Sequence, residues 1–540
     1  MTNQNVIWIM VCTILVFFMQ AGFAMLETGF TRAKNAGNII MKNLLDYCVG
    51  SILFWIVGYR IMYGTGAPQE TDFSSMAFIM YATVFCATAT TIVSGAMAGR
   101  TAFKAYLAYS AIMSAVIYPL AVRTIWNESG WLKTLGFHDC AGGTAVHVVG
   151  GMAALAGAYV VGARIGKFDL KGKARAIPGH NLTIGALGIF ILWFGWFGFN
   201  GGAVVMNDSS HALTQVGTVL FNTNICAATC AVVTMFLTWI RYGKPDVAMT
   251  LNGVLAGLVA ITAGCDVETP LGAILTAVAA AFVLIFGVEL ITKMKVDDPV
   301  GAITVHGMCG ATGSILVGLF STETGLFYTG KWNGFGIQCL GVFATAIFVL
   351  VVMFVIFTLI KVTLGLRVSQ DTEITGLDKC EHGLASSYAD FFNTAQFLSA
   401  EAANSSKIRA IDETTELNIS DYEVDGRIRN VVVIMNASKF EILKKALDKI
   451  EITGMTVTQV CGCGIQKGNT EIYRGAEYSS HLLPKIKVEI VISTVPLGLL
   501  VDTLKEVLYT GNIGDGKIFV YELENVVKIR TGAEGKEALE

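Results

Sequence analysis

The stretch DCAGGTAVHVVGGMAALAGAYVVGA, residues 139–163, decides how the rest of the chain is interpreted. It opens a long apolar segment with an aspartate, Asp139, and carries a histidine, His147, eight residues further on. The stretch DPVGAITVH, residues 298–306, repeats this spacing with Asp298 and His306 at the start of another apolar segment. Titratable side chains are costly inside a lipid bilayer, so this matched pair indicates a functional site.

The composition is that of a polytopic membrane protein. The chain has 540 residues, of which 54% are hydrophobic and 15% charged, and its mean hydropathy is +0.60. A soluble protein of this length needs much more polar surface. The 58 glycines fit close helix packing in a membrane. A net charge of −3 gives no reason to expect nucleic-acid binding.

Apolar runs long enough to cross a bilayer occur eleven times, which predicts a polytopic α-helical membrane domain over residues 1–366. With the N-terminus outside, sixteen Lys and Arg residues fall on the cytosolic side and four on the outer side. This positive-inside bias predicts an external N-terminus and a cytosolic C-terminus in the cell membrane. The runs cover residues 6–30, 38–64, 76–98, 103–125, 141–162, 182–206, 213–240, 246–264, 270–292, 301–321 and 335–366.

The two Asp-x7-His stretches open the fifth and tenth spans, which run in opposite directions in this topology. Each aspartate stands where a helix N-cap is expected, and Pro299 suits a first helical position. Eight residues of helix rise about 12 Å, so each histidine reaches about the middle of a hydrocarbon core of about 30 Å. The first five spans and the next five then form an inverted repeat with its working site at the midplane. A buried histidine satisfied by its neighbours is the alternative, but it does not explain the matched spacing and depth.

The composition changes after Leu366. Residues 367–426 are polar and acidic, which is typical of a cytosolic tail and linker. Residues 427–540 alternate strand and amphipathic helix patterns in the order β-α-β-β-α-β, which predicts a ferredoxin-like α/β domain. The connection between its second and third strands, about residues 464–482, is long enough to be functional or disordered. Most of the twelve cysteines lie in apolar spans as small buried hydrophobes, and the lone C-x-C of Cys461 and Cys463 is weak evidence for a metal.

The first 400 or so residues resemble the ammonium transporter (Amt/Mep/Rh) family. The resemblance rests on the stretches GFAMLETGFTRAKN, DCAGGTAVH, GWFGFN, VDDPVGAITVHGMCG and GLDKCEHG. It implies an eleven-span homotrimer with one pore in each subunit, ammonium as the transported substrate, and no enzymatic activity. It assigns the family's paired pore histidines to His147 and His306. Uncharged imidazoles in an apolar lumen can offer nitrogen lone pairs to ammonia.

The resemblance also assigns the entrance of the pore. It matches a carboxylate near the outer mouth to Asp139, a cation-attracting tryptophan to Trp126, and two gating phenylalanines to Phe85 and Phe199. Without the resemblance, Trp126 would suit an interfacial belt and the phenylalanines ordinary helix packing. Ala203 stands where many relatives have a serine that helps to hold the cation, which leaves recruitment to Trp126 and backbone carbonyls. The implied mechanism docks ammonium at Trp126, separates its proton before the phenylalanines, and passes ammonia along the histidines.

Residues 427–540 resemble the P-II nitrogen-signalling family. The diagnostic runs are GIQKGNTEIYRGAEYSSHLLPKIKVEI and YTGNIGDGKIFVYELENVVKIRTGAEGKEAL. The resemblance implies regulatory binding of ATP or ADP, with Mg²⁺ and 2-oxoglutarate beside ATP. Gln466 and Lys485 match the residues that hold metal and 2-oxoglutarate. The residues expected around the nucleotide are Gly462, Gly464, Gly514, Asp515, Gly516, Lys517, Lys528 and Arg530.

The long connection at 464–482 matches the T-loop of that family. Tyr478 lies at its tip, and Arg474 matches an arginine that relatives insert into the cytosolic mouth of a transporter. This implies an intramolecular P-II–pore contact, closed with ADP and released by ATP with 2-oxoglutarate. Ile465 and Lys528 stand where members of this family usually have arginines. Each replacement removes a planar guanidinium group that can form two parallel hydrogen bonds with a phosphate. The alternatives are an ammonium sensor with little net flux, a gas channel of the Rh type, which suits Trp126 less well, and a nucleotide-hydrolysing enzyme, for which no convincing nucleophile and base are found.

Overall fold

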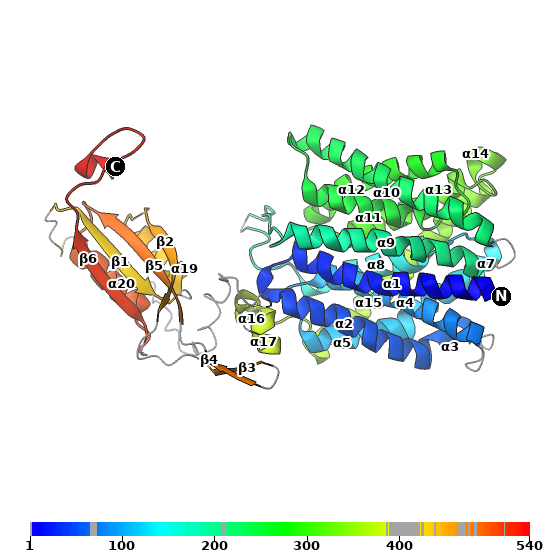
Figure 1. The fold of residues 1–540 in the computed structure, drawn as a ribbon, viewed down its shortest axis with the longest axis horizontal. Helices are drawn as coiled ribbons and strands as arrows, with labels where there is room; N and C mark the ends of the chain where they lie inside the picture. Colours follow the sequence, from blue (N-terminus) through cyan, green and yellow to red (C-terminus); the bar gives the residue numbers. More distant parts are fainter. Residues whose placement is uncertain are drawn as a thin grey trace. The chain divides into compact units, whose positions relative to one another are not determined.

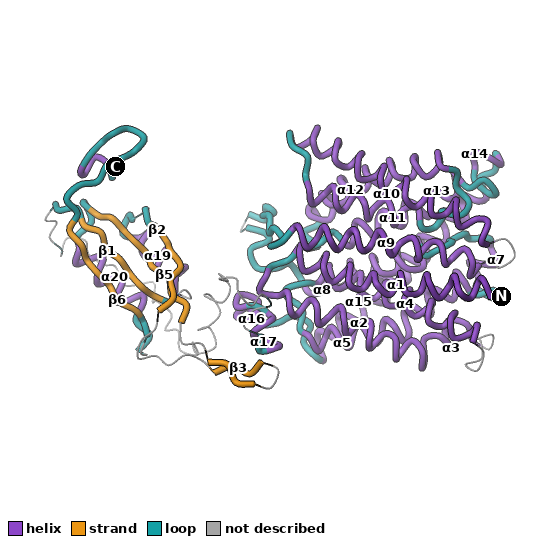
Figure 2. The backbone as a smooth tube through the Cα atoms, in the orientation of Figure 1, coloured by secondary structure: helices purple, strands orange, loops and turns teal. Residues whose placement is uncertain are grey.

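The computed structural model divides into two compact units, Met1–Ser387 and Tyr388–Glu540. The first unit is a bundle of long helices, and the second contains a β-sheet with two helices (Figures 1 and 2). The residues that the structure describes are 3–384 without 65–72, 170 and 208–211, then Ser387 and Tyr422, then 426–539 without 437–438, 453, 463–469, 474–475, 480–482 and 512–513.

Ten described helical segments of the first unit are long and apolar enough to cross a membrane. Their lipid-compatible length follows from the apolar runs of the sequence, because about 20 helical residues match a hydrocarbon core. The segments are α1 (Asn3–Phe30), Ala33–Tyr63 with α2 (Ala36–Leu53) and α3 (Tyr59–Tyr63), α4 (Phe73–Met97), Phe103–Leu135 with α5 (Phe103–Ile112), α6 (Tyr118–Trp126) and α7 (Trp131–Leu135), Gly143–Val161 with α8 (Val149–Val161), α9 (Leu182–Asn207), α10 (Ala212–Tyr242), α12 (Pro270–Lys293), Ile303–Phe320 with α13 (Cys309–Phe320), and α15 (Asn333–Thr363).

The span predicted at 246–264 is shorter than expected. Its helix, α11 (Val247–Ile261), has 15 residues, and residues 262–267 continue as turns. Every residue from Asn252 to Ile261 is buried, so α11 lies inside the bundle. Apolar composition alone therefore overstated the helical length here, because an internal segment can be equally apolar without forming helix throughout.

The two ends of the bundle differ in the elements that they carry. The start of α1, α7 and the short helix α14 (Leu326–Thr329) lie at one end, called here the α7 end (Figure 1). The short helices α16 (Gln370–Thr375) and α17 (Leu377–His382) lie at the other, called the α16 end (Figure 1). Because α7 precedes α8 and α14 follows α13, α8 and α13 run in opposite directions between these ends.

Small residues let the two oppositely directed segments cross closely. A Cβ on Gly151 of α8 would lie 2.3 Å from the Cα of Gly307, which leaves no room for any side chain at this position. Close backbone approach through glycine is a common way to pack helices in membranes. The crossing brings together the residues that precede it in each segment, including the two predicted histidines.

The segments with the histidines both begin with a π-helical turn. These turns are η5 (Gly143–Val148) and η6 (Ile303–Met308), and His147 and His306 lie within them. A π-turn makes a helix locally wider and is frequent at functional sites. The sequence analysis expected regular helix at both places.

The chain after the last long helix folds back on the first unit. Asp378 of α17 accepts hydrogen bonds from the backbone N–H groups of Gly37 and Asn38 at 2.9 and 2.7 Å, so it caps α2. Lys34 Nζ donates to the carbonyls of Glu373 and Ile374. The region expected to be a linker from residue 367 onward therefore begins with two helices that belong to the helical unit.

The second unit has the predicted α/β order. Its sheet follows the order β2-β5-β1-β6, and every neighbouring pair is antiparallel. Alternating valines and isoleucines on the inner face of the sheet pack with leucines of the two helices in one core. The elements are β1 (Arg429–Met435), α19 (Phe440–Lys449), β2 (Thr456–Gly462), β5 (Leu483–Ile492), α20 (Leu497–Leu508) and β6 (Gly516–Glu522).

The long connection between β2 and β5 contains a separate two-stranded hairpin. Strands β3 (Thr470–Tyr473) and β4 (Ala476–Ser479) pair antiparallel, with Thr470 opposite Ser479. The sequence analysis expected only a long loop here. The strands are four residues long, too short for an alternating pattern to distinguish them from loop.

Candidate functional site

The sequence placed each aspartate at a helix N-cap and Pro299 at the first helical position, and these predictions were wrong because the two π-turns begin later, at Gly143 and Ile303. The carboxylates of Asp139 and Asp298 instead reach forward and accept hydrogen bonds from the N–H groups at the start of the turns. Asp139 is buried, and its two oxygens accept four backbone hydrogen bonds of 2.8–2.9 Å, from Gly142, Gly143, Thr144 and Ala145. Asp298 accepts three, of 2.7–3.1 Å, from Gly301, Ala302 and Ile303. A negative charge at a helix N-terminus satisfies N–H groups that have no partner inside the helix.

The two histidines meet in the interior of the bundle. The Nδ1 atoms of His147 and His306 are 3.2 Å apart, and the ring centroids are 5.2 Å apart. His147 is 0% exposed and His306 is 4% exposed. Among the described residues, no hydrogen-bond partner lies near Nε2 of His147, so this buried nitrogen remains available to a small molecule.

Two stacked phenylalanines adjoin the histidine pair. The rings of Phe85 and Phe199 lie 4.0 Å apart and nearly parallel, and both are buried. The Phe199 centroid is 5.6 Å from that of His147. The hydroxyl of Tyr81 donates to the carbonyl of Phe199 at 2.7 Å, which holds the α9 backbone beside α4. This stack separates the histidines from the next aromatic residue, Trp126.

Trp126 lies on the other side of the stack, at the end of α6. Its ring centroid is 5.9 Å from that of Phe85, in an edge-to-face arrangement. Its indole Nε1 donates to the backbone carbonyl of Asp139 at 2.8 Å. Trp126, Phe85, Phe199, His147 and His306 therefore form one chain of ring contacts that runs into the protein.

The sequence analysis did not identify one aromatic residue that contacts this row of rings. Trp196 stacks on His147 with ring centroids 5.1 Å apart, and its Nε1 donates to Thr262 Oγ1 at 3.0 Å. Trp196 precedes Phe199 by three residues in the GWFGFN stretch, and side chains three apart share one helix face. That spacing is the signal that could have identified it. Ala203, one turn further along α9, is buried and offers no hydroxyl.

Buried charges surround the second cap. The Arg164 guanidinium forms two hydrogen bonds with the carboxylate of Asp297, at 2.7 and 2.9 Å, and Arg100 donates to the Asp297 carbonyl at 2.8 Å. Burial would raise the pKa of Asp297, but hydrogen bonds from Arg164 and the charge of Arg100 lower it to about 2. The carboxylate is therefore ionised at neutral pH, and the pair fixes the chain next to Asp298.

In the second unit, the glycine-rich turn meets Lys485. The buried Lys485 Nζ donates to Gly514 O at 2.6 Å and to the side chain of Asn436. Gly514 and Gly516 have positive φ values of 116° and 123°, and a Cβ on Gly516 would lie 1.9 Å from the carbonyl of Ile434. Asp515 accepts a hydrogen bond from the Thr510 backbone at 2.7 Å. The turn thus requires its glycines.

The other predicted ligand residues of the second unit lie on several different elements. Lys517 lies on β6 opposite Ile434, Gly462 ends β2, and Lys528 and Arg530 lie in the exposed chain after β6. The Lys528 backbone N–H donates to the Ala533 carbonyl at 2.8 Å. Tyr478 lies in β4, opposite Glu471. The predictions for Gly464, Gln466 and Arg474, and the Ile465 departure, lie outside the described residues.

Comparison with known proteins agrees with both parts of the chain. The model of the Ammonium Transporter Family matches residues 7–387, and that of nitrogen regulatory protein P-II matches residues 428–533. The chain belongs to the Ammonium Transporter Family and is fused to a P-II domain. It is therefore a multi-span membrane protein of a transporter family and not an enzyme.

Individual relatives cover most of the helical unit. Ammonium transporter Amt2 of Archaeoglobus fulgidus is 44% identical over 422 residues, which are 72% of this chain and 89% of the relative. Ammonium transporter 1 member 3 of Solanum lycopersicum is 37% identical over 422 residues, covering 70% and 92%. A solved structure called Sensor Amt Protein has a TM-score of 0.67 and 35% identity over 70% of this chain and 98% of its own. Candida albicans Mep2 has a TM-score of 0.62 and 26% identity, covering 69% and 87%.

Proposed function

We propose that this protein moves ammonium across the cell membrane by conducting ammonia through a narrow apolar pore. The observation that carries the proposal is the buried pair of His147 and His306, with Nδ1 atoms 3.2 Å apart next to the stacked Phe85 and Phe199. The aromatic chain leads from Trp126 at the α7 end to this pair. Uncharged rings inside an apolar wall suit a small neutral amine that needs a hydrogen-bond partner on its way.

Selectivity follows from the cost of removing a charge from water. Ammonium can transfer its proton to water on the Trp126 side of the Phe85–Phe199 stack and continue as ammonia. K⁺ has no proton to lose, so it would enter the apolar path with its full charge and lose its hydration without compensation. A pore with this construction therefore admits ammonium and excludes K⁺ of similar size.

The direct test measures ammonium-driven uptake or current in proteoliposomes. Replacement of both His147 and His306 by Ala should abolish selective flux, because it removes the polar atoms along the apolar path. The matched control is His180→Ala, which removes a half-buried ring outside the pore whose Nδ1 contacts the Thr31 carbonyl. Unchanged flux in the double variant, in protein with normal thermal stability, would contradict the proposal.

The entrance of the pore is assigned to Trp126 and its surroundings. The face of an indole attracts a cation by its quadrupole, and more strongly where water is partly excluded. Ala203 offers no hydroxyl to the cation, so recruitment rests on Trp126 and nearby carbonyl groups. The Asp139 carboxylate already accepts four backbone hydrogen bonds, so we assign it the role of capping the pore helix. The backbone carbonyl of Asp139 orients Trp126 by accepting a hydrogen bond from its indole N–H.

The P-II domain, residues 427–540, is proposed to regulate this pore. We infer that the Gly514–Gly516 turn, together with Lys517, Lys528 and Arg530, binds the phosphates of ATP or ADP, with Gly462 and Gly464 beside them. Backbone N–H groups in a glycine turn and nearby cations are the groups that phosphates require. Lys485, which reaches the same turn, and Gln466 are assigned to 2-oxoglutarate and Mg²⁺. The Lys485 contact with the Gly514 carbonyl supports this assignment, because it couples the two ligand regions.

We further propose a homotrimer with an external N-terminus and a cytosolic P-II domain, as the charge bias and the family resemblance imply. In this arrangement Arg474 of the T-loop obstructs the cytosolic mouth when ADP is bound, and ATP with 2-oxoglutarate withdraws it. Flux in proteoliposomes with each ligand tests this mechanism. Arg474→Ala should raise flux with ADP, whereas Lys449→Ala, at the end of α19 and away from the loop in sequence, should not. Equal flux in the Arg474 variant and the parent would exclude an arginine plug.

A second candidate function is that of an ammonium sensor with little net flux, which reports pore occupancy through the P-II domain. The similarity to the structure called Sensor Amt Protein favours it. The transport rate distinguishes the two functions. A sensor should bind ammonium without appreciable flux in proteoliposomes, even when ATP and 2-oxoglutarate are present, whereas a transporter should show flux that the paired histidine substitutions remove.

A further inference from the structure

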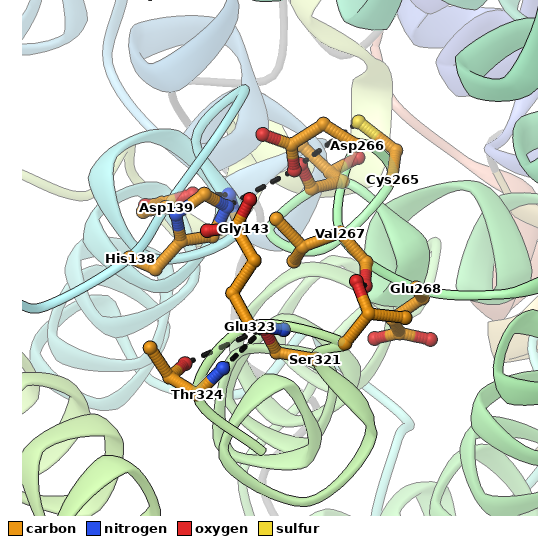
Figure 3. Close-up of polar contacts among 12 residues, drawn as sticks. His138, Asp139, Gly143, Cys265, Asp266, Val267, Glu268, Ser321, Glu323 and Thr324 are labelled. Carbon is orange, nitrogen blue, oxygen red and sulfur yellow. Dashed lines mark hydrogen bonds and ion pairs between the residues drawn. The ribbon is translucent and has the colours of Figure 1, made fainter. Parts of the chain in front are cut away.

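Two cysteines and a carboxylate lie together at the α7 end, beside the aromatic path and not part of it. The Sγ atoms of Cys140 and Cys265 and a carboxylate oxygen of Asp266 all lie within 4.8 Å of one another. Among the residues that the structure describes, they form the one group of three His, Cys, Asp or Glu side chains with metal-ligand spacing. Both cysteines are buried, and Figure 3 shows the Cys265 sulfur beside Asp266.

Backbone contacts hold the two cysteines against each other. The N–H groups of Cys140 and Ala141 donate to the carbonyls of Ala263 and Thr262, at 3.0 and 3.1 Å. The segment that leads into the first pore helix therefore lies along the turns that follow α11. A Cβ on Gly143 would lie 2.7 Å from the Ala263 Cβ, so this approach is close. The sulfur positions are thus set by main chain that is distant in sequence.

A fourth donor, the imidazole of His138, adjoins the Asp266 carboxylate but lies outside the group whose atoms are all within 4.8 Å of one another. Nε2 of His138 lies 3.0 Å from Oδ1 of Asp266, a contact drawn in Figure 3, and the His138 side chain is 32% exposed. The Gln338 side chain fixes the His138 backbone. Its Oε1 accepts a hydrogen bond from the His138 N–H at 2.9 Å, and its Nε2 donates to the His138 carbonyl at 2.8 Å. The imidazole and the carboxylate thus lie between solvent and the two buried sulfurs.

We propose that Cys140, Cys265, Asp266 and His138 form a binding site for a thiophilic divalent cation such as Zn²⁺. Two thiolates, an imidazole and a carboxylate are the donors that four-coordinate zinc takes in proteins. Thiolate donors also select zinc over Mg²⁺ and Ca²⁺, which prefer oxygen. The cation displaces the two thiol protons, and its two positive charges balance the two thiolate charges that this creates.

Other buried cysteines in the described part of the chain lack these companions. The thiols of Cys226 and Cys309 donate to helix carbonyls, of Gly257 and Ala280, inside apolar spans. Such cysteines act as small hydrophobic side chains. Cys140 and Cys265 differ because a carboxylate and an imidazole share their position, and that combination is what a metal ion needs.

The site shares its main chain with the entrance of the pore. Cys140 directly follows Asp139, whose carbonyl accepts the indole N–H of Trp126. A bound cation would fix this segment to the turns after α11. An effect of zinc on transport would depend on the proposed pore function, but the binding of zinc itself would not.

The test is metal binding by the full chain, purified in detergent and stripped with a chelator. Zn²⁺ alone is added, unbound metal is removed by gel filtration, and metal and protein are quantified. We expect one zinc ion for each chain, and Co²⁺ in its place should give a thiolate-to-metal charge-transfer band. Cys140→Ser and Cys265→Ser should each weaken binding by more than about 10-fold, the loss typical even of residues that only orient metal ligands.

Matched controls separate the site from general damage. Cys226→Ser and Cys309→Ser replace buried thiols elsewhere and should leave zinc binding unchanged. If a serine variant of the site fails to fold, Asp266→Asn, which changes only a partly exposed side chain, provides the same comparison. The proposal is overturned if the stripped parent retains no zinc, if the site variants bind as the parent does, or if Cys140 and Cys265 are joined by a disulfide in the purified chain.

Discussion

The segments that begin with Asp139 and Asp298 share their geometry but differ in their surroundings. Each carboxylate caps a π-turn, and each turn carries a histidine eight residues after the cap. At the α7 end the cap adjoins the aromatic Trp126. At the α16 end it adjoins the buried ion pair of Asp297 and Arg164. The common spacing determines where the histidines meet, and the different neighbours determine how firmly each segment is held.

The largest effect is expected from the ion pair beside the second cap. Arg164→Ala should lower the unfolding free energy by about 4 kcal/mol, because it leaves the Asp297 carboxylate buried without its partner. Thermal unfolding in detergent measures the loss. Arg241→Ala, which breaks the solvent-exposed pair with Glu289, is the control and should cost much less, because water and salt screen exposed ion pairs. Similar losses in the two variants would show that the buried pair does not anchor the second segment.

The pH dependence of stability gives a second test of the Asp297–Arg164 pair. Because the folded pKa of Asp297 is about 2, below the ordinary value of about 4, its stabilisation is complete above pH about 4 and is lost as the pH falls toward 2. In Arg164→Ala, burial without the guanidinium should raise the folded pKa of this carboxylate, so the stability that the parent loses between pH about 4 and 2 through Asp297 should shrink or disappear, and the unfolding midpoint of the variant should fall less over this range. Parallel pH profiles of parent and variant would contradict the assignment.

At the crossing of Gly151 and Gly307, an alanine substitution should cost more stability at one glycine than at the other. Gly151→Ala directs a methyl group at the Gly307 backbone, at 2.3 Å, and should cost about 3 kcal/mol and misalign the histidines. Gly307→Ala meets the flexible end of Met152 at 2.9 Å and the Gly151 backbone only at 3.3 Å, which is a tight contact but a longer one, so it should cost less. Thermal unfolding and flux should both rank the variants in this order. The reverse order would mean that the crossing is looser on the α8 side.

The two caps themselves should differ by a smaller amount. Asp139→Ala deprives four N–H groups of their acceptor and Asp298→Ala deprives three, so we expect losses of about 2 and about 1 kcal/mol. Urea or thermal unfolding of the purified chain compares them. The matched Asn variants keep one carbonyl acceptor and should recover part of each loss. An Asp298 variant less stable than the Asp139 variant would show that neighbours outweigh the number of hydrogen bonds.

The smallest effect is expected at Trp126. Trp126→Phe keeps an aromatic face but removes the donor to the Asp139 carbonyl, which should cost about 1 kcal/mol in stability. It should raise the substrate concentration needed for half-maximal flux more than it lowers the maximal flux. Trp332→Phe, at an exposed position, is the control. Identical concentration dependence in the two variants would remove Trp126 from the entrance.

The cap–histidine arrangement was predictable from the sequence because it is local. The two aspartates mark the approach to each helix, and their equal spacing to His147 and His306 predicts that the two rings lie at matching positions. The helical rise assumed between them was too long, because the π-turns begin only at Gly143 and Ile303. The strands around the core of the second unit were predictable for a similar reason, since the continuous apolar run in β1 and the alternation of apolar residues in β5 are visible without tertiary context. In these cases neighbours in sequence carry the information.

The remaining features depend on contacts between distant segments. Trp196 reaches His147 only because α9 lies beside the segment that begins with η5, and Cys140 meets Cys265 only because main chain from two parts of the bundle is hydrogen-bonded. The π-turns and the shortened α11 likewise follow from packing, not from composition. Spacing along one chain cannot reveal which faces of separate helices meet.

The Nδ1–Nδ1 contact of the two histidines has a consequence for polarity. A hydrogen bond between these atoms holds a single proton, which belongs to one ring at a time. When both rings are uncharged, the ring that donates it has a bare Nε2, and the other ring must carry its proton on Nε2. The pair therefore presents an acceptor at one end and a donor at the other. Reversing this direction requires both imidazoles to change tautomer together.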